Sequence, residues 1–198
     1  MITLIAIVSL IYPGRFRLLF AQAGNQAVDF VRSTSERLVA ITNGAASPQE
    51  KRTQLEEVVD STVDVDDIAQ FCLGRFWRLA TPEQQKRYMV LFHDLLVTEI
   101  AGHLGEYRGV QVTMGLARAS ADTEIVITVV ERPQAPTMQV DWVVSTATGH
   151  PKITDMLAGG TSMRLTQSSD FASYLSRHQY NIHEFLEGLQ QMVARSRQ

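Results

Sequence analysis

The apolar positions in the first half of the chain recur with a helical period. Val28, Val31 and Ile41 fall near the spacing of one helix face, and Asn43-Gly44 is a typical stop signal. Because every third or fourth residue lies on the same side of an α-helix, this pattern predicts an amphipathic helix that ends near residue 43.

Two further helices are predicted from the capping residues at their N-termini. The segments SPQE at residues 47–50 and TPEQ at residues 81–84 each combine an N-cap hydroxyl, a proline at the first helical position and an acid or amide three residues after the cap. Such a capping box satisfies free amide donors at the start of a helix. The first helix is expected to run to about Asp60, and the second to fray near Gly102 and Gly105. The apolar stripe of the second helix consists of Tyr88, Leu91, Phe92, Leu95, Leu96 and Ile100.

From Gly109 onward the apolar period changes to two, which is the period of a β-strand. The predicted strands cover residues 110–116, 123–131, 137–146, 151–157 and 161–167. The second of these is apolar on both faces, as expected of a central strand. No helix-length segment separates the strands, so the predicted sheet is an antiparallel meander.

After the strands, the pattern returns to helix over residues 169–177 and 181–194. Asn181 is a good N-cap residue, and Glu184 follows it by three positions. Helices, then a curled antiparallel sheet, then helices predict an α+β domain in which helices cover the apolar face of the sheet. This architecture can leave a cavity between the two layers.

Composition narrows the possible partners. A length of 198 residues predicts one domain, and 45% hydrophobic with 20% charged residues excludes wholesale disorder. A formal net charge of −3 and a pI near 5.9 give no basic surface of the kind that phosphate backbones require, so no nucleic-acid partner is expected. The single cysteine, Cys72, cannot form an internal disulfide.

The N-terminus resembles an export signal. Residues 2–12 form an apolar run as long as the hydrophobic region of a signal peptide and too short to span a bilayer, and Ala21-Gln22-Ala23 supplies a cleavage pattern. We expect residues 1–23 to be a signal peptide and residues 24–198 to form the mature domain. Arg15 and Arg17 follow the apolar run instead of preceding it, so an uncleaved anchor and a misassigned start codon are alternatives.

Motifs for catalysis or metal binding are scarce. The five histidines show no HExxH spacing, and GxSxG, P-loop and GxGxxG patterns are missing from the sequence. No metal or cofactor is therefore expected. Acids gather at residues 60–67 without the glycine and distal glutamate of a calcium loop, and Asp64 is expected to cap a short helix that carries Ile68 and Phe71.

The densest apolar feature is FCLGRFWRLATPEQQ, residues 71–85, which combines several aromatic and aliphatic side chains with two arginines. One interpretation is that the rings pack into the core. The other is that they wall an elongated apolar pocket between helices and sheet, where the methionines of the chain would adapt to a variable ligand. The residues alone leave both interpretations open.

Two segments resemble a known family. DVDDIAQFCLGRFWRLATPEQQKRYMVLFHDLLV, residues 64–97, resembles the signature of the MlaC family, also called toluene-tolerance or phospholipid-binding ABC-transporter auxiliary proteins. KITDMLAGGTSMRLTQSSDFASYL, residues 152–175, resembles the family's second motif, although its GGTS turn departs from the family pattern. The resemblance covers nearly all of residues 26–193. It implies a periplasmic carrier with an NTF2-like fold that holds phospholipid acyl chains between sheet and helices.

The same resemblance implies a monomeric binding protein that is not an enzyme. Its implied partners are phospholipid, an inner-membrane MCE-domain ABC transporter complex and an outer-membrane lipoprotein complex, and its role would be to maintain outer-membrane lipid asymmetry. A hopanoid-associated carrier of the HpnM sub-branch is one alternative. Others are an NTF2-like enzyme that pairs His93 or His103 with Asp66 or Glu99, and a structural adaptor with a filled core.

The expected lipid-binding residues are side chains thought to face the space between helices and sheet, with Arg75 as the cation near its mouth. They are Phe71, Leu73, Arg75, Phe76, Trp77, Phe92, Leu95, Val112, Met114, Ile125, Ile127, Val140, Trp142 and Met163.

Overall fold

The computed structural model describes residues 14–120 and 122–196, and within these residues the chain forms six α-helices and five β-strands. The helices are α1 (Gly14–Asn43), α2 (Pro48–Thr62), α3 (Val65–Leu73), α4 (Pro82–His103), α5 (Met163–Arg177) and α6 (Ile182–Arg195). Two 3₁₀ helices, η1 (Gly74–Arg78) and η2 (Leu104–Tyr107), follow α3 and α4. The strands are β1 (Gln111–Ser120), β2 (Thr123–Glu131), β3 (Met138–Ser145), β4 (Lys152–Ala158) and β5 (Thr161–Ser162).

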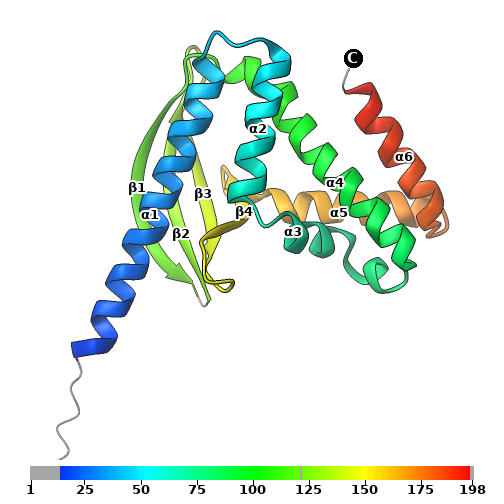
Figure 1. The fold of residues 1–198 in the computed structure, drawn as a ribbon, viewed down its shortest axis with the longest axis horizontal. Coiled ribbons are helices and arrows are strands. Elements are labelled where there is room, and N and C mark those ends of the chain that lie inside the picture. Colours follow the sequence, from blue (N-terminus) through cyan, green and yellow to red (C-terminus); the bar gives the residue numbers. More distant parts are fainter. Residues whose placement is uncertain (1–13, 121, 197–198) are drawn as a thin grey trace, which may run out of the picture.

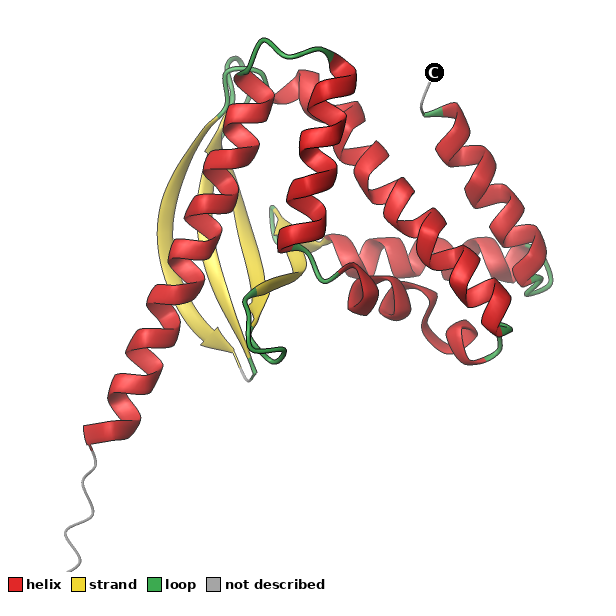
Figure 2. Ribbon diagram, viewed as in Figure 1, coloured by secondary structure: helices red, strands yellow, loops and turns green. Residues whose placement is uncertain are grey.

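The strands form one sheet in the order β1-β2-β3-β4-β5, with every neighbouring pair antiparallel (Figure 2). The predicted meander is therefore confirmed. Register shifts interrupt the ladder between Met114 and Ala117 in β1 and between Val143 and Val144 in β3. Such irregularities increase local twist and bend the sheet, which lets it curve around a helix.

Helix α1 lies along one face of this sheet (Figure 1). Ala27 and Val31 on α1 are fully buried against apolar side chains that β2 and β3 direct toward the helix. We call this core the sheet cluster. Its buried members are Ala27, Val31, Val110, Val126, Val130, Val140, Trp142, Val144 and Ile153.

A second core lies beside the sheet, among helices α3 to α6 (Figure 1). Tyr88 of α4 is completely buried there, and rings from α5 and α6 surround it. We call this core the helical cluster. Its buried members are Ala69, Cys72, Leu73, Phe76, Tyr88, Leu91, Phe92, Leu95, Phe171, Leu175, Phe185, Leu186, Leu189 and Val193.

The helix starts lie where the sequence places them. Ser47 and Thr81 cap α2 and α4, and both predicted capping boxes are formed. The Asp64 carboxylate accepts a hydrogen bond from the backbone N–H of Asp67 at 3.1 Å and so caps α3. Asn181 caps α6 in the same way. Local side-chain chemistry thus determines these boundaries, because each cap satisfies an amide that the helix itself leaves without a partner.

The predicted closing strand over residues 161–167 is wrong. Only Thr161 and Ser162 pair with β4, and α5 begins at Met163. The Ser162 hydroxyl accepts a hydrogen bond from the Leu165 backbone N–H at 3.1 Å, so it caps a helix. The alternation of Met163 and Leu165 that resembled a strand instead places two exposed apolar side chains on the first turn of α5.

The α+β architecture is confirmed for the described residues: α1 packs on one face of a five-stranded antiparallel sheet, and the other helices form a layer beside it. Residues 1–13 of the predicted export signal lie outside the described part of the chain, and α1 starts at Gly14. Among helices of the described residues, none combines the length and the apolar character needed to cross a membrane.

Candidate functional site

The residues predicted to line one apolar pocket lie in several different places. Leu73, Phe76, Phe92 and Leu95 belong to the helical cluster, where all four are buried. Neither of the two pockets described below has any of these four residues in its lining. The structure therefore places these four side chains in a packed core.

Ring contacts explain why this core is filled. Phe171 and Phe185 meet edge to face with their centroids 5.0 Å apart, and Tyr88 lies 6.2 Å from each of them. These distances are typical of favourable aromatic pairs. The Tyr88 hydroxyl donates to the Ala69 carbonyl oxygen at 2.8 Å, and burial raises the pKa of the phenol far above its usual value. The Tyr88 hydroxyl is thus hydrogen-bonded, and the rings of Phe92, Phe171 and Phe185 pack around the Tyr88 ring.

Four other predicted residues lie at the surface of the helical layer. Phe71 is exposed beneath the Arg164 guanidinium, whose central carbon is 4.2 Å from the ring centroid. Arg75 is exposed, Trp77 is half-buried and Met163 is exposed. None of the four lines either pocket. Arg75 does not lie at the mouth of either of these two pockets, and its expected role near a lipid remains a prediction.

The sheet residues divide between the two faces. Val140 and Trp142 are buried in the sheet cluster, and Val112 and Met114 pack against it. Ile125 and Ile127 lie on the opposite face, because Val126, the residue between them, is the one that packs toward α1. Their expected inward orientation is wrong. The β2 sequence is apolar on both faces, so alternation alone could not choose between them.

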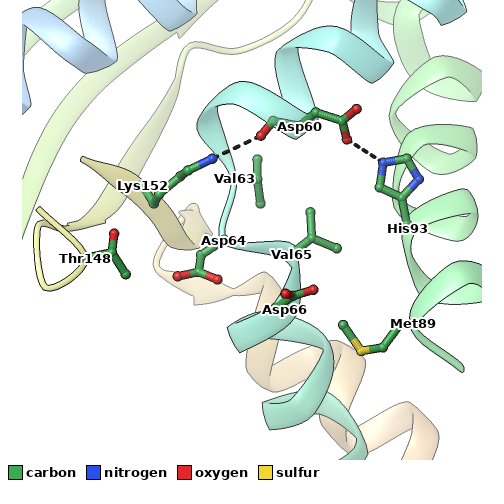
Figure 3. A pocket seen from close by; sticks show the side chains of 9 residues that line it. All are labelled: Asp60, Val63, Asp64, Val65, Asp66, Met89, His93, Thr148 and Lys152. Carbon is green, nitrogen blue, oxygen red and sulfur yellow. Dashed lines mark hydrogen bonds and ion pairs between the residues drawn. The ribbon is translucent and has the colours of Figure 1, made fainter. Parts of the chain in front are cut away.

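The larger pocket lies where the sheet layer meets the helical layer, and we call it the junction pocket. It has a volume of about 570 Å³. Its walls come from the C-terminal end of α2, the start of α3, one side of α4 and the β3–β4 connection (Figure 3). Its nine lining residues are Asp60, Val63, Asp64, Val65, Asp66, Met89, His93, Thr148 and Lys152.

Charged groups form one part of this lining and are held by specific bonds. The Asp60 carboxylate lies 2.7 Å from His93 Nε2, which links α2 to α4. Lys152 Nζ donates to the backbone carbonyl oxygen of Asp60 at 3.0 Å (Figure 3). It also donates to that of Ser61 at 3.1 Å. The Lys152 ammonium therefore lies at the end of α2, where the helix dipole is negative and favours a cation.

The other part of the lining is apolar. Val63, Val65 and Met89 lie between the charged groups (Figure 3). Val63 forms a parallel bridge with Ile153, and the Asp64 backbone N–H donates to the Ile153 carbonyl oxygen at 2.9 Å, so this wall is anchored to β4. A lining with an apolar wall and a charged rim can accept an amphiphilic ligand, and its volume lies in the range of about 300–1,000 Å³ usual for ligand sites.

A smaller pocket of about 290 Å³, which we call the side groove, lies between α1 and β1. Ser35 is buried in its wall, and its hydroxyl has no hydrogen-bond partner among the described residues. By contrast, the Thr34 and Thr42 hydroxyls on the same helix donate to backbone carbonyl oxygens. The lining residues are Arg32, Ser35, Glu36, Val39, Ala40, Val112 and Met114.

The alternative acid–histidine pairs are not formed as expected. His93 contacts Asp60 instead of Asp66, although Asp66 lines the same pocket. His103 Nδ1 lies 2.7 Å from Glu106, one turn along the chain. Within the described part of the chain, no group of three or more histidine, cysteine or acidic side chains is arranged to hold a metal ion.

Comparison with known proteins identifies the family. The sequence profile described as MlaC protein matches residues 31–191 of this chain. The chain belongs to the MlaC family. A similar solved structure is the phospholipid-binding protein from Ralstonia solanacearum in complex with a phospholipid, with 24% sequence identity and a TM-score of 0.75. The match covers 87% of this chain and 99% of that one, and it supports the same fold.

The two MlaC-like motifs meet at the junction pocket. Residues 64–97 run from the cap of α3 into α4, and residues 152–175 run from β4 into α5. The first segment contributes Asp64, Val65, Asp66, Met89 and His93 to the lining, and the second contributes Lys152. The sequence pattern marks the acids of residues 60–67 and the methionines in general, but no spacing rule links α3, α4 and β4, so it does not predict that these residues meet.

Proposed function

We propose that this protein is a periplasmic carrier that binds a phospholipid and shuttles it between the outer and inner membranes. The single observation that supports the location is that both MlaC-like motifs contribute to the junction pocket. The phospholipid in the solved relative's complex supports the ligand class. Its partners would be an outer-membrane lipoprotein complex and an inner-membrane MCE-domain ABC transporter, and the carrier would act as a monomer without a cofactor.

The physical basis of such a carrier is the transfer of acyl chains into an apolar space. Each buried methylene contributes about 0.8 kcal/mol, so two long chains provide a large driving force without any chemical step. We assign the chains to the side of the junction pocket formed by Val63, Val65 and Met89, from which they would extend between the sheet and helical clusters.

The headgroup belongs at the charged rim in this proposal. Lys152 uses two of its three N–H donors on α2 carbonyl oxygens and offers the third to a phosphate, while Asp66 offers its carboxylate to an amine. A zwitterionic headgroup would satisfy both kinds of charge, and charge-assisted hydrogen bonds are stronger than neutral ones. The rim therefore favours a headgroup that carries an amine beside its phosphate.

Pocket filling tests the assignment. Met89→Trp places an indole in the junction pocket, whereas Val90→Trp places the same group at a neighbouring position on α4 that is 60% exposed. We expect organic extraction and mass spectrometry to recover lipid from the wild type and from Val90→Trp, and at least about tenfold less from Met89→Trp, since a loss of 1.4 kcal/mol already gives that factor. Circular dichroism checks that both variants fold.

A matched pair on β1 separates the two pockets. Met114→Trp fills the side groove, and Leu116→Trp is its exposed control on the same strand. Loss of lipid from Met114→Trp alone would move the binding site to the side groove. Equal lipid recovery from all four variants would contradict both locations.

The same extraction distinguishes the alternative functions. Recovery of a hopanoid instead of a phospholipid favours the hopanoid-associated carrier. A protein free of lipid, with a turnover that disappears in His93→Gln, favours an enzyme built on the His93–Asp60 pair.

A further inference from the structure

The exposed residues that follow α3 in the aromatic motif do not line the junction pocket. The chain leaves α3 through η1, and this segment meets the turn between α5 and α6 at one end of the helical layer, away from the sheet (Figure 1). The rings of Phe76 and Tyr180 stack with centroids 5.7 Å apart. We call the side chains at this end the tip, which consists of Arg75, Trp77, Arg78, Leu79 and Tyr180.

The tip exposes large apolar side chains. Leu79 is 68% exposed and Tyr180 is 51% exposed. Trp77, just before Leu79 in the chain, is half-buried and packs partly against the helical cluster. Both Gln179 and Tyr180 adopt positive φ angles, 52° and 60°. This backbone conformation is unfavourable for residues other than glycine. The Tyr180 backbone N–H donates to the Leu175 carbonyl oxygen at 2.7 Å and helps to hold this turn. The fold thus presents the Tyr180 ring outward at a conformational cost.

The tip also carries positive charge that no carboxylate of the described residues pairs with. The Arg75 guanidinium lies over the rings of Phe76 and Tyr180, at 4.9 and 5.6 Å. Within the described residues, neither Arg75 nor Arg78 takes part in an ion pair.

The acids closest in sequence to the tip have other interactions. Glu83, in the first turn of α4, has a lowered pKa because backbone and Thr81 hydrogen bonds stabilise its anion. Glu184 lies 2.6 Å from His178 Nδ1. The two arginines of the tip are therefore available for an external anion.

We propose that the tip docks on the surface of an anionic phospholipid bilayer. Tryptophan and tyrosine rings favour the headgroup level of a membrane, and arginine can pair with lipid phosphates while its aliphatic stem stays in the apolar region. Leu79 would enter the boundary between headgroups and acyl chains. The whole chain has a net charge of −3, so an anionic surface would attract the tip and repel much of the rest, which orients the protein.

The chemistry of the tip fits a bilayer better than a second protein. Its exposed apolar side chains, Leu79 and Tyr180, lie beside two arginines that have no ion pair among the described residues. A few exposed apolar groups beside unpaired arginines suit a surface that they can penetrate. Self-association through the tip would place like charges face to face, which is unfavourable.

Vesicle co-sedimentation tests the proposal. We expect the full-length protein to bind vesicles of phosphatidylglycerol and phosphatidylethanolamine, to bind phosphatidylcholine vesicles weakly, and to dissociate as salt screens the charges. Arg78→Gln should lower the partition coefficient about fivefold, the equivalent of about 1 kcal/mol per basic residue at an anionic surface. Leu79→Ala should lower it by a similar factor.

Matched controls lie elsewhere on the molecule. Leu116→Ala removes an exposed leucine on β1, and Arg195→Gln removes an exposed arginine at the opposite end of α6 from the tip. Both should bind vesicles like the wild type. Met89→Trp should also bind vesicles, so that docking through the tip is separated from loading of the junction pocket.

Tryptophan fluorescence gives a second measurement. The chain has two tryptophans, Trp77 at the tip and Trp142 buried in the sheet cluster. Brominated acyl chains in the vesicles should quench Trp77, and Trp77→Phe should abolish the quenching. Vesicle binding that is equal in the wild type, Arg78→Gln and Leu79→Ala would overturn the proposal. The proposal would also be overturned if the wild type did not bind anionic vesicles but formed a dimer that was lost in Leu79→Ala. The tip would then bind a second copy of the chain.

Discussion

The two cores of this protein are built from different side chains and leave different amounts of space. The helical cluster is rich in aromatic rings, and Tyr88 and Phe171 each contact both Phe92 and Phe185 as well as one another. The sheet cluster is mainly aliphatic, with valines from β2 and β3 facing α1. Both pockets border the sheet side or the junction, and neither is lined by a buried residue of the helical cluster.

This difference follows from shape. Large rings from α4, α5 and α6 interlock in three dimensions, and close packing leaves few voids. A single helix on a curved sheet contacts the sheet mainly along one line. Beside that line, small side chains on the helix leave space that larger ones would fill. Ser35 and Ala40 of α1 are small and line the side groove together with Val112 and Met114 of β1. The side groove therefore lies in the aliphatic part of the molecule, and the junction pocket lies between the two cores.

Truncation of a central ring is the strongest way to break the helical cluster. Phe171→Ala removes a ring that contacts Tyr88, Phe92 and Phe185, and we expect the free energy of unfolding to fall by about 3–5 kcal/mol. Chemical denaturation measures this loss. Val126→Ala in the sheet cluster deletes less volume and should cost about 2 kcal/mol. A larger loss for Val126→Ala would contradict the contrast between the two cores.

A buried hydrogen bond in the sheet cluster gives a prediction with a stability loss of intermediate size. Trp142 Nε1 donates to the Thr128 hydroxyl at 2.9 Å, and that hydroxyl donates to the Val140 carbonyl oxygen at 3.2 Å. Thr128→Val leaves the indole N–H buried without an acceptor, so the free energy of unfolding should fall by about 1–3 kcal/mol. The double variant with Trp142→Phe removes the orphaned donor. It should lose less stability than the sum of the two single variants.

The smallest effect concerns Cys72 in the helical cluster. Burial raises the pKa of its thiol to about 12, so the native thiol stays protonated near neutral pH. A thiol reagent at pH 8 should label the folded protein slowly and the denatured protein rapidly. Because the unfolded thiol ionises at lower pH than the folded one, this group lowers stability as pH rises above about 9. Rapid labelling of the native protein would show that the core opens easily.

Local patterns predicted much of this fold because their causes are local. The capping residues Ser47, Thr81 and Asn181 mark helix starts through hydrogen bonds to amides three residues away. The segment 123–131 coincides with β2 because its β-branched residues suit an extended backbone. The strand expected over residues 161–167 failed because the same side-chain alternation is compatible with a helix once Ser162 supplies a cap.

The sequence by itself determined the α+β class, the order of the strands and the family membership, since these depend on periodicity, caps and two contiguous motifs. Only the tertiary structure decided which face of β2 packs on α1, that the aromatic motif fills a core and ends in an exposed tip, and that Asp60, Met89 and Lys152 surround one pocket. Those facts depend on contacts between segments far apart in the chain, and no local spacing encodes such contacts.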